Sequence, residues 1–179
     1  MRSSDGRLEI VFNGEIYNYL ELRQELEGRG VRFRTQSDTE VLMEAWRLWG
    51  AAALEKFDGM FAFGLFDSKS GELVLARDPF GEKPLYYTDA GGGFAFASEL
   101  HALRGVPGFS ADIDLDTVLE YLLLQYINAP RTLYRCARKL PPGHYLRVNA
   151  AGGFELRRYF EFQPGGGEYR ERKLDDLAD

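Results

Sequence analysis

The stretch that decides the fold is Met60-Phe61-Ala62-Phe63-Gly64-Leu65-Phe66. Side chains of a β-strand alternate between the two faces of a sheet, and this run is apolar at both parities. Both faces of the strand must therefore be covered, by two sheets or by a sheet and helices. Further short β-forming runs, separated by turns rich in Gly and Pro, are expected at 8–12, 73–76, 85–87, 94–97, 145–148 and 154–159.

Helical patterns flank these strands and favour an antiparallel α+β fold with helices outside. The first helix is expected over 17–27, with Asn18 as N-cap and an edge strand at 31–35 after it. A capping box at 37–40, in which Ser37 caps and Glu40 reaches back, predicts a second helix that ends at Gly50. A third helix begins after Asp114 and carries an apolar stripe over 115–126.

Composition excludes several classes of protein. The chain has 179 residues, 45% of them hydrophobic, which suits one domain with a real core. Its 22 Lys+Arg against 28 Asp+Glu give a net charge of −6, so neither nucleic acid nor a membrane is expected as a partner. A single cysteine and the lack of a long apolar run fit a protein of the reducing cytoplasm.

Asn13-Gly14 is the first candidate for chemistry, and two interpretations stand side by side. Asn-Gly between apolar runs is typical of a hairpin turn. The residues after this pair have a helical pattern, however, and a strand that ends in Asn-Gly presents a side-chain amide and a backbone amide that could stabilise an oxyanion. The sequence by itself favours the turn.

Other polar residues have structural explanations at this level. Asp38 complements the dipole of the second helix, although a carboxylate there could also bind a ligand amine. The run 77–84, with two prolines and a glycine, indicates a rigid turn. Cys136, His144 and His101 form no known dyad or metal spacing, and the chain contains no zinc, calcium or phosphate-loop motif.

Six segments in order resemble class II glutamine amidotransferase domains, in particular the glutaminase half of glutamine-hydrolysing asparagine synthetases. They are NGEIYN at 13–18, SDTE at 37–40, GMFAF at 59–63, RDPFGEKPLYY at 77–87, FASEL at 96–100 and LPPGHY at 140–145. The resemblance covers roughly residues 8–160. It implies a four-layer αββα sandwich of antiparallel sheets, the N-terminal-nucleophile hydrolase architecture.

The resemblance also implies a mechanism and a site. In this family an N-terminal Cys thiolate attacks the carboxamide of glutamine, and its own α-amino group moves the proton. Asn13 and Gly14 match the oxyanion hole, and Glu15 and Asp38 match the positions that bind the α-amino group of the substrate. L-glutamine is therefore the expected ligand, with no cofactor in this domain.

Departures from the family pattern shape the remaining expectations. The family nucleophile lies upstream of the Asn-Gly-Glu strand, whereas this chain begins with Met1-Arg2, so we expect a domain without its N-terminal strands and inactive as a separate chain. Residues 1–162 are expected to form that domain and 163–179 a linker toward an absent synthetase domain, which would carry ATP and magnesium and use the ammonia.

Two alternatives to this function stay open, and so does the assembly. One is a non-catalytic domain of the same fold that binds an amino acid or a partner. The other is another class II amidotransferase, such as a sugar-phosphate or purine-pathway enzyme. A homodimer is one assembly left open.

Overall fold

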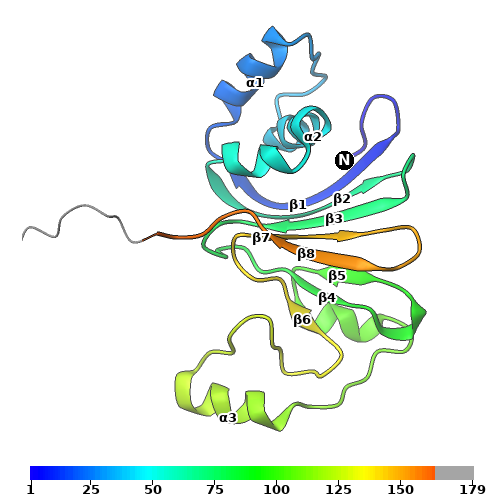
Figure 1. The fold of residues 1–179 in the computed structure, drawn as a ribbon, viewed down its shortest axis with the longest axis vertical. Coiled ribbons are helices and arrows are strands. Elements are labelled where there is room, and N and C mark those ends of the chain that lie inside the picture. Colours follow the sequence, from blue (N-terminus) through cyan, green and yellow to red (C-terminus); the bar gives the residue numbers. More distant parts are fainter. Residues whose placement is uncertain (164–179) are drawn as a thin grey trace, which may run out of the picture.

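The computed structural model describes residues 1–163 and shows two antiparallel sheets packed face to face, with helices outside them (Figure 1). The larger sheet has the order β1-β2-β3-β7-β8, and the smaller sheet has the order β5-β4-β6. Helices α1 and α2 cover the free face of the larger sheet, while α3 lies beyond the smaller one. The α+β fold with antiparallel sheets is confirmed.

The secondary-structure elements of the described residues have these bounds. In chain order they are β1 (Leu8–Ile16), α1 (Tyr19–Gly28), α2 (Asp38–Trp49), η1 (Gly50–Lys56), β2 (Gly59–Asp67), β3 (Glu72–Arg77), β4 (Tyr86–Thr88), η2 (Ala90–Gly92), β5 (Ala95–Ala97), η3 (Leu100–Gly105), α3 (Leu115–Leu124), β6 (Arg138–Lys139), β7 (His144–Val148) and β8 (Phe154–Arg158). The expected linker at 163–179 lies outside the described residues except for residue 163.

Strand β2 is buried on both faces, as its apolar run predicts. Phe61 and Phe63 pack beneath α1 and α2 in one core, and Ala62 belongs to a second core between the sheets. Gly64 has a particular reason to be glycine, because a Cβ there would lie 2.3 Å from the ring of Phe96 in the smaller sheet. The absence of a side chain on β2 thus lets the two sheets approach each other.

Strand β1 is longer than predicted and passes through the Asn-Gly pair. The expectation that it ends at Phe12, with Asn13-Gly14 at its end, is wrong, because Asn13 pairs with Ala62 and Gly14 with Phe61 up to Ile16 opposite Gly59. The hairpin-turn interpretation is wrong for the same reason. The close pairing depends on glycine, since a Cβ on Gly14 would lie 2.1 Å from the carbonyl oxygen of Met60.

The start of α2 differs from a capping box, although the helix is where the sequence predicts it. Ser37 Oγ accepts from the amide of Thr39 at 3.1 Å, and Gly50 ends the helix with a φ of 57°. Glu40 does not reach back to Ser37. Its carboxylate accepts the amides of Arg34 and Thr35 at 2.7–3.2 Å, which is why the expected edge strand at 31–35 does not form.

The predicted N-cap of α1 is wrong, and the apolar stripe of α3 lies on the surface. Asn18 precedes α1 without capping it, because its side chain donates to the carbonyl of Lys56 and accepts from the amide of Asp58. The apolar stripe of α3 is not buried among residues 1–163, where Leu122 and Leu123 are 71% and 83% exposed. Asp114 does cap α3, as predicted.

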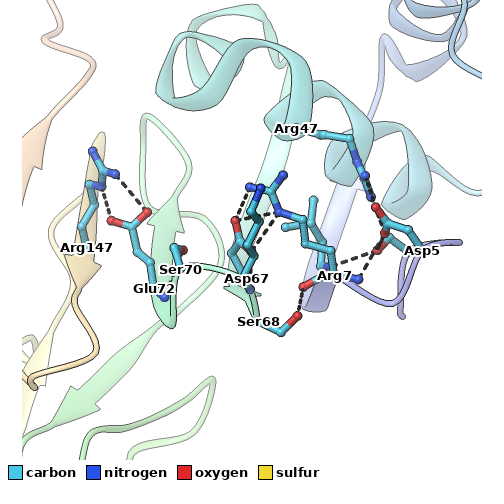
Figure 2. A network of polar contacts seen from close by, with 11 residues as sticks. Asp5, Arg7, Arg47, Asp67, Ser68, Ser70, Glu72 and Arg147 are labelled. Atoms are coloured by element: carbon cyan, nitrogen blue, oxygen red, sulfur yellow. Dashed lines mark hydrogen bonds and ion pairs between the residues drawn. The ribbon is translucent and has the colours of Figure 1, made fainter.

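Several ion pairs lie along one edge of the larger sheet and connect neighbouring strands and α2 (Figure 2). Arg7 donates to both carboxylate oxygens of Asp67, from Nε at 3.0 and 3.1 Å and from Nη2 at 2.6 Å, and so ties the start of β1 to the end of β2. Arg47 of α2 donates to Asp5 at 2.6 and 3.0 Å, which holds the turn before β1 against the helix. The hydrogen bonds of Arg7 lower the pKa of Asp67 to about 2.

Candidate active site

The site lies at the open edge of β1, the edge that β2 does not cover. The amide of Ile10 on this edge donates to the carbonyl of Met1 at 2.8 Å, and the amide of Ile16 donates to Asp38 Oδ2 at 3.2 Å. Backbone amides of a strand alternate between its two edges, so the amide of Gly14, which has the same parity, also points to the open edge. It is available there to a ligand.

The side chain of Asn13 points between the two sheets. Its Nδ2 donates to Ser98 Oγ at 3.2 Å, across the space that separates β1 from the end of β5. A cavity of about 230 Å³ adjoins this contact, with Val11 and Phe96 among its apolar lining residues. Asn13 therefore presents a carboxamide donor at a partly apolar cavity, beside the backbone amide of Gly14.

Asp38 stands beside this segment although it is 22 residues away from Ile16 in the sequence. It is the first residue of α2, which packs over β1, and its second carboxylate oxygen lies within 3.3–3.4 Å of the hydroxyls of Ser37 and Thr39. The prediction that Asp38 begins a helix close to the Asn13–Glu15 segment is confirmed. Its contact with a substrate amine stays a prediction.

Glu15 adds negative charge at the same end of β1. Its side chain is exposed and lies, by the alternation of the strand, on the same face as that of Asn13. The pKa of the Tyr17 hydroxyl is raised, first by partial desolvation and then by the negative charges of Glu82 and Glu15. The surroundings of Tyr17 are therefore acidic, which suits an ammonium group.

The loop after β3 is held by many hydrogen bonds to Asp78 and Arg77, which agrees with the rigid turn that its prolines and glycine predict. Asp78 is fully buried, and its carboxylate accepts four backbone amides, from Phe61, Phe80, Glu82 and Lys83. Arg77 donates to three carbonyls, those of Lys83, Leu140 and Gly81. Burial lowers the pKa of Arg77, and the Asp78 charge opposes that shift.

The thiol and the imidazoles are not among the residues that line the cavity beside Asn13. Cys136 donates its Sγ hydrogen to the carbonyl of Ser110, and it precedes β6, at the edge of the smaller sheet opposite β5. His144 Nδ1 contacts the carbonyl of Pro142 at 2.7 Å, and His101 is exposed in η3. Their interpretation as structural residues agrees with these positions.

Metal sites and membrane spans are both absent from residues 1–163. No group of three His, Cys, Asp or Glu side chains in this part of the chain could hold a metal ion. None of its helices combines the length and the apolar character needed to cross a bilayer.

Ser98 is a member of the site that the sequence does not reveal as one, although it lies within the FASEL segment. Nothing in the local sequence pairs it with Asn13, because the two residues are 85 positions apart and belong to different sheets. A signal did exist, since Ser98 directly follows a strand, where polar side chains often reach a cavity.

Comparison with known proteins gives this arrangement a class and then a family. The structure of glutamine phosphoribosylpyrophosphate amidotransferase from Bacillus subtilis superposes on this chain with a TM-score of 0.62 at 25% identity. The superposition covers 89% of this chain and 31% of that one. The architecture is therefore that of the N-terminal-nucleophile amidotransferases. A sequence profile described as "Glutamine amidotransferase domain" matches residues 1–160. This chain belongs to that glutamine amidotransferase family.

Several relatives of similar sequence are named as glutamine-hydrolysing asparagine synthetases. A putative synthetase of this kind from Mycobacterium bovis is 45% identical over 148 residues, which are 80% of this chain and 23% of the relative. Asparagine synthetase 1 of Bacillus subtilis is 42% identical over 157 residues, covering 87% of this chain and 25% of the relative. The chain thus spans about a quarter of the length of these relatives.

Proposed function

We propose that this domain hydrolyses the side-chain amide of L-glutamine and releases ammonia for an asparagine-forming reaction. The observation that supports the proposal is that Asn13, whose Nδ2 donates to Ser98, is followed by Gly14 on β1, and that Asp38 accepts the amide of Ile16 two residues further on. Two N–H donors fixed at one place are what a tetrahedral oxyanion requires, and donors held in position before the reaction need no reorganisation during it.

The carboxylates give the substrate its orientation. Asp38 and Glu15 would bind the α-ammonium of glutamine, because a charge-assisted hydrogen bond to a carboxylate is stronger than a neutral one. Asp38 is held by Ile16 and the hydroxyls around it, so its carboxylate is placed before the substrate arrives. Replacing Asp38 or Glu15 by the amide should therefore raise KM more than it lowers kcat.

The nucleophile would reach the site from a segment joined ahead of Met1. Residues 1–3 already pair with β1 in antiparallel fashion, since Ser3 donates to the carbonyl of Leu8 and Ile10 donates to that of Met1. An extended segment joined to Met1 would continue along Val11 toward Gly14. A Cys at the start of such a segment would attack the carboxamide carbon and pass its proton to its own α-amine.

The acceptor of the ammonia is proposed to belong to a further domain. The relatives are about four times as long as the region they share with this chain, and they are named as synthetases. ATP and magnesium would act in that domain and not in this one. The exposed leucines of α3, at 59–83% for Leu119 and Leu122–Leu124, form an apolar face that such a domain would cover.

The experiment that tests this proposal measures glutamate release by the chain carrying a Cys-initiated N-terminal segment. Asn13→Ala should lower kcat about 10²–10³-fold. Asn128→Ala, which changes an asparagine near the end of α3, should leave kcat unchanged. The 179-residue chain assayed without the segment should release no glutamate, since Cys136 is engaged elsewhere. Turnover by that chain, abolished in Cys136→Ser, would contradict the proposal.

A further inference from the structure

Ser98 is the polar side chain that touches Asn13 from the opposite sheet. It follows β5 directly, and β5 is fixed by pairing of Tyr86 with Ala97 and of Tyr87 with Phe96. Ser98 Oγ lies 3.2 Å from Asn13 Nδ2, and both side chains line the cavity between the sheets. The contact thus joins a residue of the proposed oxyanion hole to a frame that is independent of β1.

A carboxamide needs such a partner if it is to serve as an oxyanion donor. The side chain of asparagine ends in a broad, roughly two-fold torsion, so an unrestrained amide exchanges the places of its oxygen and its NH₂ group. The oxygen in the donor position would repel a developing oxyanion. In the structure Ser98 Oγ accepts one N–H of Asn13, which restrains the side chain in this orientation and leaves the second N–H for the substrate.

We infer that Ser98 is a positioning residue, which holds the carboxamide of Asn13 with its NH₂ group toward the reacting carbonyl. The inference rests on the proposed function, because a positioned donor matters only if Asn13 stabilises an oxyanion. Ser98 makes no contact with the substrate in this account. Its effect is exerted through Asn13, and its loss should therefore lower kcat and leave KM nearly unchanged.

The test uses the chain with a Cys-initiated segment and compares Ser98→Ala with Ser98→Thr, which keeps the hydroxyl. Ser98→Ala should lower kcat roughly tenfold, the effect of one hydrogen bond, and Ser98→Thr should recover most of that loss. A double-mutant cycle separates positioning from a general effect on structure. In the Asn13→Ala background, Ser98→Ala should have no further effect on kcat.

The outcomes distinguish this inference from the proposal on which it rests. If Asn13→Ala leaves kcat unchanged, the proposed function fails. If Asn13→Ala lowers kcat but Ser98→Ala does not, or if the two losses multiply, the positioning role is overturned while the oxyanion role of Asn13 stands.

A second measurement needs no activity. In the 179-residue chain, the side-chain NH₂ resonances of Asn13 should move in Ser98→Ala and return in Ser98→Thr. Unchanged resonances in Ser98→Ala would overturn the inference.

Discussion

Asp78→Asn should destabilise the domain by roughly 3–6 kcal/mol, although it changes only one atom of the side chain. Asp78 is fully buried, and each of its carboxylate oxygens accepts two backbone amides. Oδ1 takes those of Phe80 and Glu82 at 3.0 and 2.9 Å, and Oδ2 takes those of Lys83 and Phe61 at 3.0 and 3.3 Å.

The magnitude is set by the number of donors that lose an acceptor. In either orientation of the new carboxamide, its NH₂ group faces two backbone amides that it cannot accept. Hydrogen bonds to a charged group contribute about 1.5–3 kcal/mol each, so two of them give the range stated. A domain of this size has a free energy of unfolding of about 5–15 kcal/mol, so the loss is a large fraction of the total.

Urea unfolding of the 179-residue chain, measured by the fluorescence of the two tryptophans in α2, determines this loss. Glu82→Gln is the matched control, because it removes the same charge from an exposed side chain of the same loop and should change the free energy of unfolding by less than about 0.5 kcal/mol. Free energies of unfolding within about 1 kcal/mol of each other for the two variants would refute the reasoning.

Two further predictions concern the paired strands and the acid stability. Gly14→Ala should destabilise the domain by more than about 3 kcal/mol in the same urea assay, because Gly14 has a φ of +151° and an added Cβ would overlap the Met60 carbonyl. Gly28→Ala adds a methyl group in open space and should change the free energy of unfolding little. Equal effects of the two substitutions would contradict the pairing described for β1. Arg7 holds the pKa of Asp67 at about 2, below its ordinary value of 3.8, so the pair adds stability above about pH 4 that is lost as the pH falls toward 2. Asp67→Asn should therefore reduce the decrease in the free energy of unfolding between pH 5 and pH 2 by about 1 kcal/mol, whereas Asp112→Asn should not. The same decrease in Asp67→Asn as in the unchanged chain would contradict a stabilising role of the pair.

Much of the fold could be predicted because the patterns are local. The two-sided apolar run of β2, the hairpin of β7 and β8, and the Ser37 and Gly50 boundaries of α2 each depend on neighbouring residues. The errors arose where a side chain of the next helix or a neighbouring strand supplies the hydrogen-bond partner. Glu40 takes the amides that an edge strand at 31–35 would need, and β2 keeps Asn13 in the sheet instead of letting it turn.

Some residues of the candidate site could be assigned from the sequence, and others become visible only in the structure. Asn13, Gly14, Glu15 and Asp38 were assigned through resemblance to a family, since spacing by itself favoured a turn and a helix cap. The structure adds that Asp38 reaches β1 through the amide of Ile16. It also adds Ser98, whose contact with Asn13 depends on the packing of two sheets, whereas the local sequence indicates only that Ser98 follows a strand.

If the proposed function holds, the open edge of β1 binds glutamine through Asn13, Gly14 and Asp38. Titration of L-glutamine into the ¹⁵N-labelled chain, carrying an N-terminal segment in which Ser replaces the initiating Cys, tests it most directly. We expect the largest changes in amide resonances at Asn13–Ile16 and Asp38. L-leucine should not reproduce them, and Asp38→Asn should weaken binding. Binding of glutamine that leaves the Gly14 amide and the Asn13 side chain unmoved, or that shifts resonances only around Cys136, would contradict this expectation.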